Sequence, residues 1–161
     1  MSNKFPQRKS PRLVDYDYSQ EGAYFVTICV HRRHYLFGDV VEDEMTLSNM
    51  GEIAAERWLS IPEHYPDVDL DLYVIMPNHM HGIIVLTGRS DFKTFLGRVI
   101  NAYKGAVTAQ IRKQRGSKVA VWQGRYHDHV IRDVWDLNRV RQYILHNPSM
   151  WEKDTLFGND G

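Results

Sequence analysis

Apolar and polar positions along the chain follow two periods, and each period predicts one kind of element. Runs rich in aromatic and β-branched residues predict strands, and these lie at 22–33, 68–77, 79–86 and 119–133. Apolar residues at helical spacing predict helices at 48–66, 90–116 and 136–146. We expect an interruption of the last strand at Gln123-Gly124. We also expect the last helix to end at Asn147-Pro148, because a residue before proline avoids helical geometry.

The order of these elements is β-α-β-β-α-β, followed by one more helix. This order predicts an α+β fold of the ferredoxin-like (RRM-like) kind, a split β-α-β arrangement in which a four-stranded antiparallel sheet carries helices on one face. A chain of 161 residues most simply forms one domain. We expect residues 1–15 to be a mobile basic arm and residues 16–161 to be a single domain.

Composition excludes several classes of protein. The single cysteine, Cys29, rules out an intramolecular disulfide and a cysteine-rich zinc site, and it suits a reducing cytoplasm. No apolar run approaches the ~20 residues that span a bilayer, and the basic N-terminus lacks the apolar stretch of a signal peptide. The sequence therefore predicts a cytoplasmic protein with no membrane partner.

The charges sum to zero but are segregated along the chain. Residues 93–118 carry seven cations and no acid, which is typical of a surface that binds a polyanion. A solvated helix face is the alternative, but the run is longer and purer than solubility requires, so we favour nucleic acid. The candidate phosphate contacts are Arg12 in the arm and, in or near the basic helix, Arg98, Lys104, Arg112, Lys113, Arg115 and Lys118.

Two histidines, His79 and His81, stand one residue apart in an otherwise apolar strand. Strand alternation sends them to the same face, about 7 Å apart along the backbone. They can therefore converge on one metal ion, or they can face solvent. In the ferredoxin-like order this strand is central, where unpaired polar groups are costly. The pair consequently needs a partner from elsewhere in the chain.

Tyr143 and Asn147 are the candidate partners, because residues four apart share one face of a helix. The amide oxygen of Asn147 is a hard donor that suits Mg²⁺ or Mn²⁺ better than Zn²⁺. The simpler interpretation of Asn147 is a helix C-cap before Pro148, and that of Tyr143 is an ordinary half-buried aromatic residue.

Two other groups of residues compete for these roles. His127-Asp128-His129 is a second His-x-His, which we expect to form an exposed or DNA-facing edge, with His129 as a further DNA contact. Tyr103 is a rival nucleophile among the cations of the basic helix. It falls on the apolar stripe of that helix, however, so packing in the core is the better interpretation.

The segments "PNHMH", "WQGRYHDHVIR" and "YILHNP", the last followed by a tryptophan and an aspartate, resemble the single-tyrosine HUH transposases. The REP-associated tyrosine transposases are the most similar branch, and the resemblance extends over roughly residues 22–154. HUH denotes histidine, a bulky apolar residue and histidine, and Met80 occupies the middle position. The resemblance implies that His79, His81 and Asn147 are metal ligands and that Tyr143 is the nucleophile on a C-terminal catalytic helix.

The same resemblance implies an activity. It predicts Mg²⁺- or Mn²⁺-dependent cleavage and strand transfer of single-stranded DNA beside a hairpin, through a 5′-phosphotyrosine intermediate, by a monomer or a homodimer. Two alternatives stay open. One is a non-catalytic ferredoxin-like module that binds nucleic acid. The other is a metal-dependent nuclease that uses water as the nucleophile, with Tyr143 in a structural role.

Overall fold

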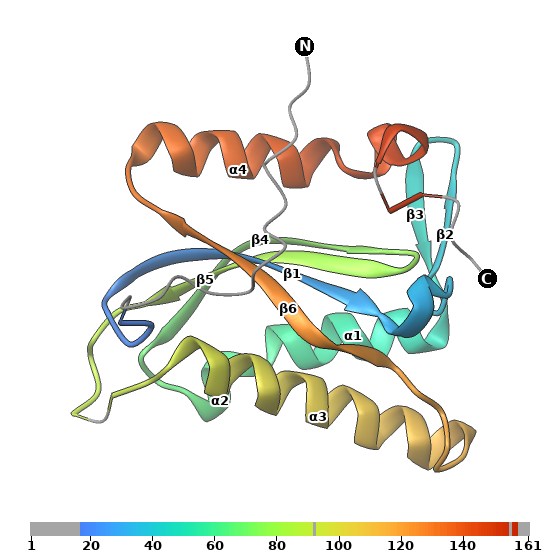
Figure 1. Ribbon diagram of the computed structural model, residues 1–161, viewed down its shortest axis with the longest axis horizontal. Helices are drawn as coiled ribbons and strands as arrows, with labels where there is room; N and C mark the ends of the chain where they lie inside the picture. Colours follow the sequence, from blue (N-terminus) through green and yellow to red (C-terminus); the bar gives the residue numbers. More distant parts are fainter. Residues whose placement is uncertain (1–16, 92, 155, 158–161) are drawn as a thin grey trace.

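The computed structural model describes residues 17–91, 93–154 and 156–157. The expected basic arm, residues 1–15 with Arg12, lies outside the described residues. The described part forms an antiparallel four-stranded sheet (Figure 1). From one edge to the other, its strands are β4 (Val68–Met76), β5 (His79–Leu86), β1 (Gly22–Val30) and β6 (Trp122–Ile131). The predicted ferredoxin-like α+β fold is confirmed.

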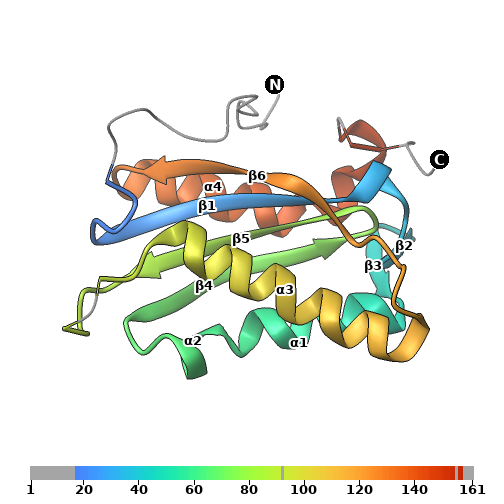
Figure 2. The same ribbon diagram turned by 60° about the horizontal axis from the view of Figure 1, so that its bottom comes forward.

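Helices cover both faces of this sheet. Figures 1 and 2 show α1 (Asn49–Leu59) and α3 (Leu96–Arg115) on one face and α4 (Val134–His146) on the other. Alternation along β5 distributes its side chains between the two layers. Met80 and Ile84 join the large core under α1 and α3, whereas Ile83 packs with Phe25, Val140 and Ile144 under α4.

Several boundaries differ from the sequence expectations. The first strand stops at Val30, because a short 3-10 helix, η1 (His31–Arg33), follows with a positive φ of 54° at Arg32. The helix expected at 48–66 divides into α1 and the short α2 (Ile61–His64), with a proline in the first turn of α2. The helix α3 starts at Leu96 instead of residue 90, because Phe95 before it is extended.

The structure also contains elements that the sequence pattern did not predict. A hairpin of β2 (Gly38–Val41) and β3 (Glu44–Leu47) stands beside the sheet, and a 3-10 helix, η2 (Pro148–Lys153), follows α4. The last strand, β6, runs through Gln123-Gly124 without a break, and the irregularity appears as a register shift opposite Ile28 and Val30. Among the described residues, no helix is long and apolar enough to cross a membrane.

Candidate metal and nucleophile site

The two histidines of β5 lie on the sheet face that α4 covers. His79 and His81 have no exposed surface, and their Nε2 atoms are 3.1 Å apart. They pair across β5 and β1 with Cys29 and Thr27, so the pleat of two central strands holds both rings in place. The structure therefore brings the two imidazoles to a single point.

Hydrogen bonds determine which nitrogen of His79 is available. Asn78 donates from Nδ2 to the carbonyl of Leu156 at 2.6 Å, and this carbonyl can only accept. The amide oxygen of Asn78 must therefore face His79 Nδ1, 2.7 Å away, and accept its proton. When the ring is neutral, the Nε2 atom of His79 then carries a lone pair toward His81.

A hydroxyl plays the corresponding part for His81. Thr27 Oγ1 lies 2.7 Å from His81 Nδ1 and is itself buried. Because a hydroxyl can donate or accept, His81 can carry its proton on either nitrogen. In one tautomer Nε2 donates to His79; in the other, Nδ1 donates to Thr27 and both Nε2 lone pairs point to one spot. Such outer hydrogen bonds commonly orient metal-binding histidines.

Burial keeps both rings neutral. Desolvation lowers the pKa of His79 to about 4, although Asp154 and the Asn147 amide partly oppose it. Desolvation, with His79 as a second cause, lowers the pKa of His81 well below its usual value. Neutral imidazole is the form that binds metals, so both rings are available as ligands at pH 7.

The helix α4 brings Tyr143 and Asn147 over the same point. Val140 and Ile144 pack on the apolar patch of the sheet, and residues three and four apart share this inward face. The ring of Tyr143 meets the ring of His81 with centroids 5.2 Å apart and contacts Phe25 edge-on. Tyr143 is half-buried.

Asn147 is the C-cap of α4 and is buried. Its Nδ2 donates weakly to the carbonyl of Tyr143 at 3.4 Å, which leaves Oδ1 pointing elsewhere. The amide is close enough to influence the pKa of His79, yet Oδ1 has no well-formed hydrogen bond to any described residue. The cap interpretation and the ligand interpretation are therefore compatible, because the backbone caps the helix and leaves the side-chain oxygen available.

Asp154 adds a further oxygen that the sequence analysis did not identify. Its Oδ2 lies 3.9 Å from His79 Nε2, and ligand atoms of His79, His81 and Asp154 lie within 4.8 Å of one another. In the tautomer of His81 that is protonated on Nδ1, the two Nε2 atoms, the amide oxygen and the carboxylate oxygen are all acceptors. Buried acceptors without donors are costly, and a divalent cation satisfies them together. These residues thus fit a hard divalent metal ion.

The cations of the basic segment occupy the opposite layer of the molecule. They lie on or beside α3, which covers the sheet face away from His79 and His81 (Figure 2). Lys104 donates to the carbonyl of Gln123 at 2.8 Å, and Arg112 donates to that of Val119 at 3.0 Å. The side chains of Arg98, Lys113, Arg115 and Lys118 are exposed. The structure does not bring these residues to the histidine pair.

The competing residues are also placed. His129 lies on the α4 face but is bonded through Nε2 to Asp136 at 2.7 Å, so it ties β6 to the start of α4. His127 pairs across Thr27 from His81 and is half-buried. Tyr103 is buried on the other side of the sheet and donates to the carbonyl of Ala54 at 2.9 Å. Burial raises the pKa of Tyr103, which makes it a poor nucleophile.

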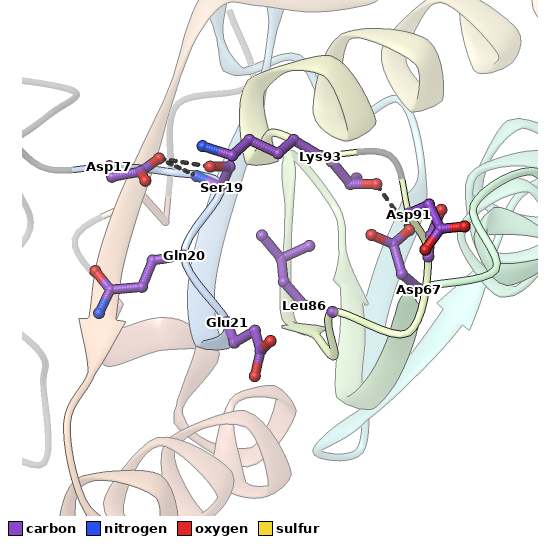
Figure 3. Close-up of a pocket in the computed structure, with 11 residues that line it drawn as sticks. Asp17, Ser19, Gln20, Glu21, Asp67, Leu86, Asp91 and Lys93 are labelled. Carbon is purple, nitrogen blue, oxygen red and sulfur yellow. Dashed lines mark hydrogen bonds between the residues drawn. The ribbon is translucent and has the colours of Figure 1, made fainter.

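A hollow of about 540 Å³ at the other end of β5 has a different character. Figure 3 shows Leu86, the last residue of β5, among the carboxylates of Asp17, Glu21, Asp67 and Asp91. The strand runs from His79 to Leu86, which separates this hollow from the histidines by about 20 Å. Its lining has four carboxylates and one cation, Lys93, so its net charge repels phosphate and it is not part of the candidate site.

Three residues near the histidine pair had no role in the site predicted from the sequence: Thr27, Asn78 and Asp154. Thr27 sits in an apolar strand, and its polarity in a central position was the available signal. Asn78 was interpreted as a turn residue before β5. Asp154 follows the last helix with no periodic pattern, so only the folded chain shows that it reaches His79.

Comparisons with known proteins find similar proteins that are named as transposases. A search of protein-family models gives no match. A Haemophilus influenzae protein of uncharacterized function is 35% identical over 168 residues, covering 93% of each chain. A second Haemophilus influenzae protein, named as a REP-associated tyrosine transposase, is 28% identical over 142 residues, covering 82% of this chain and 73% of its own.

A solved structure of a REP-associated tyrosine transposase bound to a REP hairpin has the same fold. It superimposes with a TM-score of 0.60 at 20% identity, over 93% of this chain and 88% of that chain. The chain is thus similar in sequence to one protein named as a REP-associated tyrosine transposase, and it has the fold of another.

Proposed function

We propose that this protein is a metal-dependent DNA strand transferase that cleaves and rejoins single-stranded DNA through Tyr143. The observation that carries the proposal is the contact between the Tyr143 ring and the His81 ring, at 5.2 Å, above a buried cluster of acceptors. The nucleophile and the metal-binding nitrogens thus come from one chain. The active form in this proposal is a monomer or a homodimer.

The ligands in this proposal are His79, His81 and Asn147, and the ion is Mg²⁺ or Mn²⁺. Such an ion, when bound, neutralises and orients the scissile phosphate. Asn78 and Thr27 orient the two imidazoles so that their Nε2 atoms converge, and these two atoms would hold the ion. Phe25 packs against both His81 and Tyr143 and so keeps the two rings in contact.

The chemistry of Tyr143 follows from its phenol. The oxygen of Tyr143 attacks the phosphorus and forms an O–P bond to the 5′ side, while the bond from phosphorus to the 3′ oxygen breaks. The phenol, with an ordinary pKa of about 10, gives up its proton, and the departing 3′ oxygen gains one. The phosphotyrosine conserves the energy of the broken phosphodiester bond, so a 3′-hydroxyl can attack the phosphorus and rejoin the strands.

The substrate that fits best is single-stranded DNA next to a hairpin. Support comes from the related transposase, whose structure is bound to a REP hairpin. DNA as substrate also agrees with the expected cytoplasmic location. The exposed cations of α3 lie across the sheet from Tyr143, so we assign them to phosphates outside the reacting segment.

A denaturing gel tests this function. Purified protein is incubated with Mn²⁺ and labelled single strands that carry a hairpin, and a covalent protein–DNA band is expected. The variant Tyr143→Phe removes only the attacking oxygen, so the band should disappear. The matched control Tyr103→Phe removes a phenol from the other side of the sheet, so the band should persist.

The gel also separates the alternatives. Cleavage that continues in Tyr143→Phe would indicate a nuclease that uses water. Binding of the same strands by the wild-type protein, without cleavage of any of them, would indicate a non-catalytic nucleic-acid-binding module.

A further inference from the structure

The chain beyond α4 folds back over the histidine pair. The short helix η2 begins directly after Asn147, and its Trp151 ring lies 5.9 Å from the His79 ring. The ring of the same tryptophan also contacts the ring of Tyr35, with centroids 5.6 Å apart, which anchors the segment on the body of the protein. The segment that follows α4 is therefore packed against the site, not beside it.

The two oxygens of the Asp154 carboxylate have different partners. Asp154 Oδ1 accepts from the backbone N–H of Leu156 at 2.8 Å, which fixes the side chain. The other oxygen, Oδ2, faces His79 Nε2 at 3.9 Å, and the Asp154 side chain is only 7% exposed. Ligands about 2.1 Å from an octahedral ion are about 3 Å apart when adjacent and about 4.2 Å apart when opposite. The separations of 3.1 and 3.9 Å fit this range.

We propose that Asp154 is the carboxylate ligand of this metal centre, in addition to His79, His81 and Asn147. The inference rests on the proposed function and completes its ligand set. The two imidazoles and the amide are neutral, so Asp154 supplies the negative charge that hard divalent ions favour. Four protein ligands leave two octahedral positions for oxygens of the scissile phosphate.

Asn78 makes the segment part of the same centre. It accepts from His79 Nδ1 and donates to the carbonyl of Leu156, so one side chain joins a ligand to the C-terminal segment. Asn78 is completely buried, as the bridge requires. It is a positioning residue. Because an ion bound by both His79 and Asp154 favours the docked segment, metal binding and segment docking stabilise each other.

The first test measures Mn²⁺ binding by calorimetry without DNA. Asp154→Asn keeps an acceptor for the Leu156 N–H but removes the charge, and its affinity for Mn²⁺ should fall at least about tenfold. Glu152→Gln removes an exposed carboxylate from the same segment and should bind Mn²⁺ like the wild-type protein. Equal affinities of Asp154→Asn and wild type would overturn the assignment of Asp154.

The second test follows the docked segment directly. In the wild-type protein, Mn²⁺ should slow hydrogen exchange at the backbone amides of Asp154 and Leu156, both of which donate hydrogen bonds within the segment. The protection should be lost in Asp154→Asn and in Asn78→Ala. Mn²⁺ that protects β5 but leaves these two amides unprotected would also overturn the inference.

The two proposals fail in distinguishable ways. If the wild-type protein forms the covalent band and Asp154→Asn binds Mn²⁺ like the wild type, only the assignment of Asp154 as a ligand is overturned. If the wild-type protein neither binds Mn²⁺ nor forms the band, the proposed function and the assignment of Asp154 are both overturned.

Discussion

The two faces of the sheet use the same strands for different purposes. On the face under α1 and α3, buried residues such as Trp58, Ile84 and Val99 form a large continuous core. On the face under α4, four buried residues form a small apolar patch, and the polar residues Thr27, His79 and His81 lie beside it, fully or almost fully buried. One face provides the hydrophobic stabilisation that allows the other to hold polar chemistry away from water.

This difference is most direct in the strand β5. Its alternate residues face the large core and the candidate site, so we expect a substitution at one position to affect stability and a substitution at its neighbour to affect the proposed chemistry. Variants on the two faces can therefore separate these effects, and the largest expected change is in the free energy of unfolding.

Gly82 is a position where the core face tolerates little change. A Cβ atom there would lie 2.3 Å from Cζ2 of Trp58, a ring with no exposed surface. We expect Gly82→Ala to lower the free energy of unfolding by about 1–3 kcal/mol, the usual cost of overpacking. Urea denaturation of the purified variants measures this.

The matched control is Gly105→Ala on α3. A Cβ atom at Gly105 meets nothing within 4 Å, and alanine favours the helix by up to about 1 kcal/mol. This variant should therefore be slightly more stable than the wild type. Destabilisation of both variants to the same extent would show that Trp58 is not the cause.

The exposed cations of α3 test whether the core face also contacts DNA. In the triple variant Arg112→Gln, Lys113→Gln, Arg115→Gln, we expect weaker binding of single-stranded DNA. The slope of log affinity against log salt should shrink by about 0.7 for each phosphate that a cation no longer neutralises, hence by about 2 for three cations. Fluorescence anisotropy at several salt concentrations measures the slope.

The yield of covalent adduct at saturating DNA serves as the internal control. It should be unchanged, because α3 lies across the sheet from Tyr143 (Figure 2). An unchanged affinity for DNA and an unchanged salt slope would instead indicate that the cations of residues 93–118 form a solvated helix face.

The smallest effect concerns the attachment of α4 to its face. Arg141 donates two hydrogen bonds to Asp71 on β4, at 2.9 and 2.6 Å, and these bonds are the main cause that lowers the pKa of Asp71. A carboxyl group with a lowered pKa stabilises the fold above its unfolded pKa of about 3.9. That stabilisation is lost as the pH falls through the lowered value.

We expect Arg141→Met to lower stability at pH 7 by less than about 1 kcal/mol, since the pair is partly exposed. The difference from wild type should shrink as the pH approaches ~3, below the unfolded pKa, and thermal unfolding at both pH values measures it. Arg89→Met breaks the more exposed pair with Asp69 and should cost less at pH 7. A difference that stays constant in acid would contradict the role of the Asp71 charge.

Some features could be predicted because they depend on residues close together in the chain. Strand alternation puts His79 and His81 on one face, and helical spacing puts Tyr143 and Asn147 on another. The hairpin at 38–47 was missed because its turn residues, Glu42 and Asp43, adopt positive φ values of 51° and 64° without the glycine that usually marks such turns. The sequence at 38–47 therefore contains no local pattern that predicts a hairpin.

The sequence by itself determined the order of the elements, the face that each candidate residue shares and the segregation of charge. Only the tertiary structure decided that Tyr143 meets His81, that α3 lies on the far side of the sheet and that Asp154 returns to His79. The physical reason is the separation along the chain of the residues that interact. Backbone geometry repeats over a few residues and can be read locally, whereas the meeting of two faces depends on packing between segments far apart in the chain.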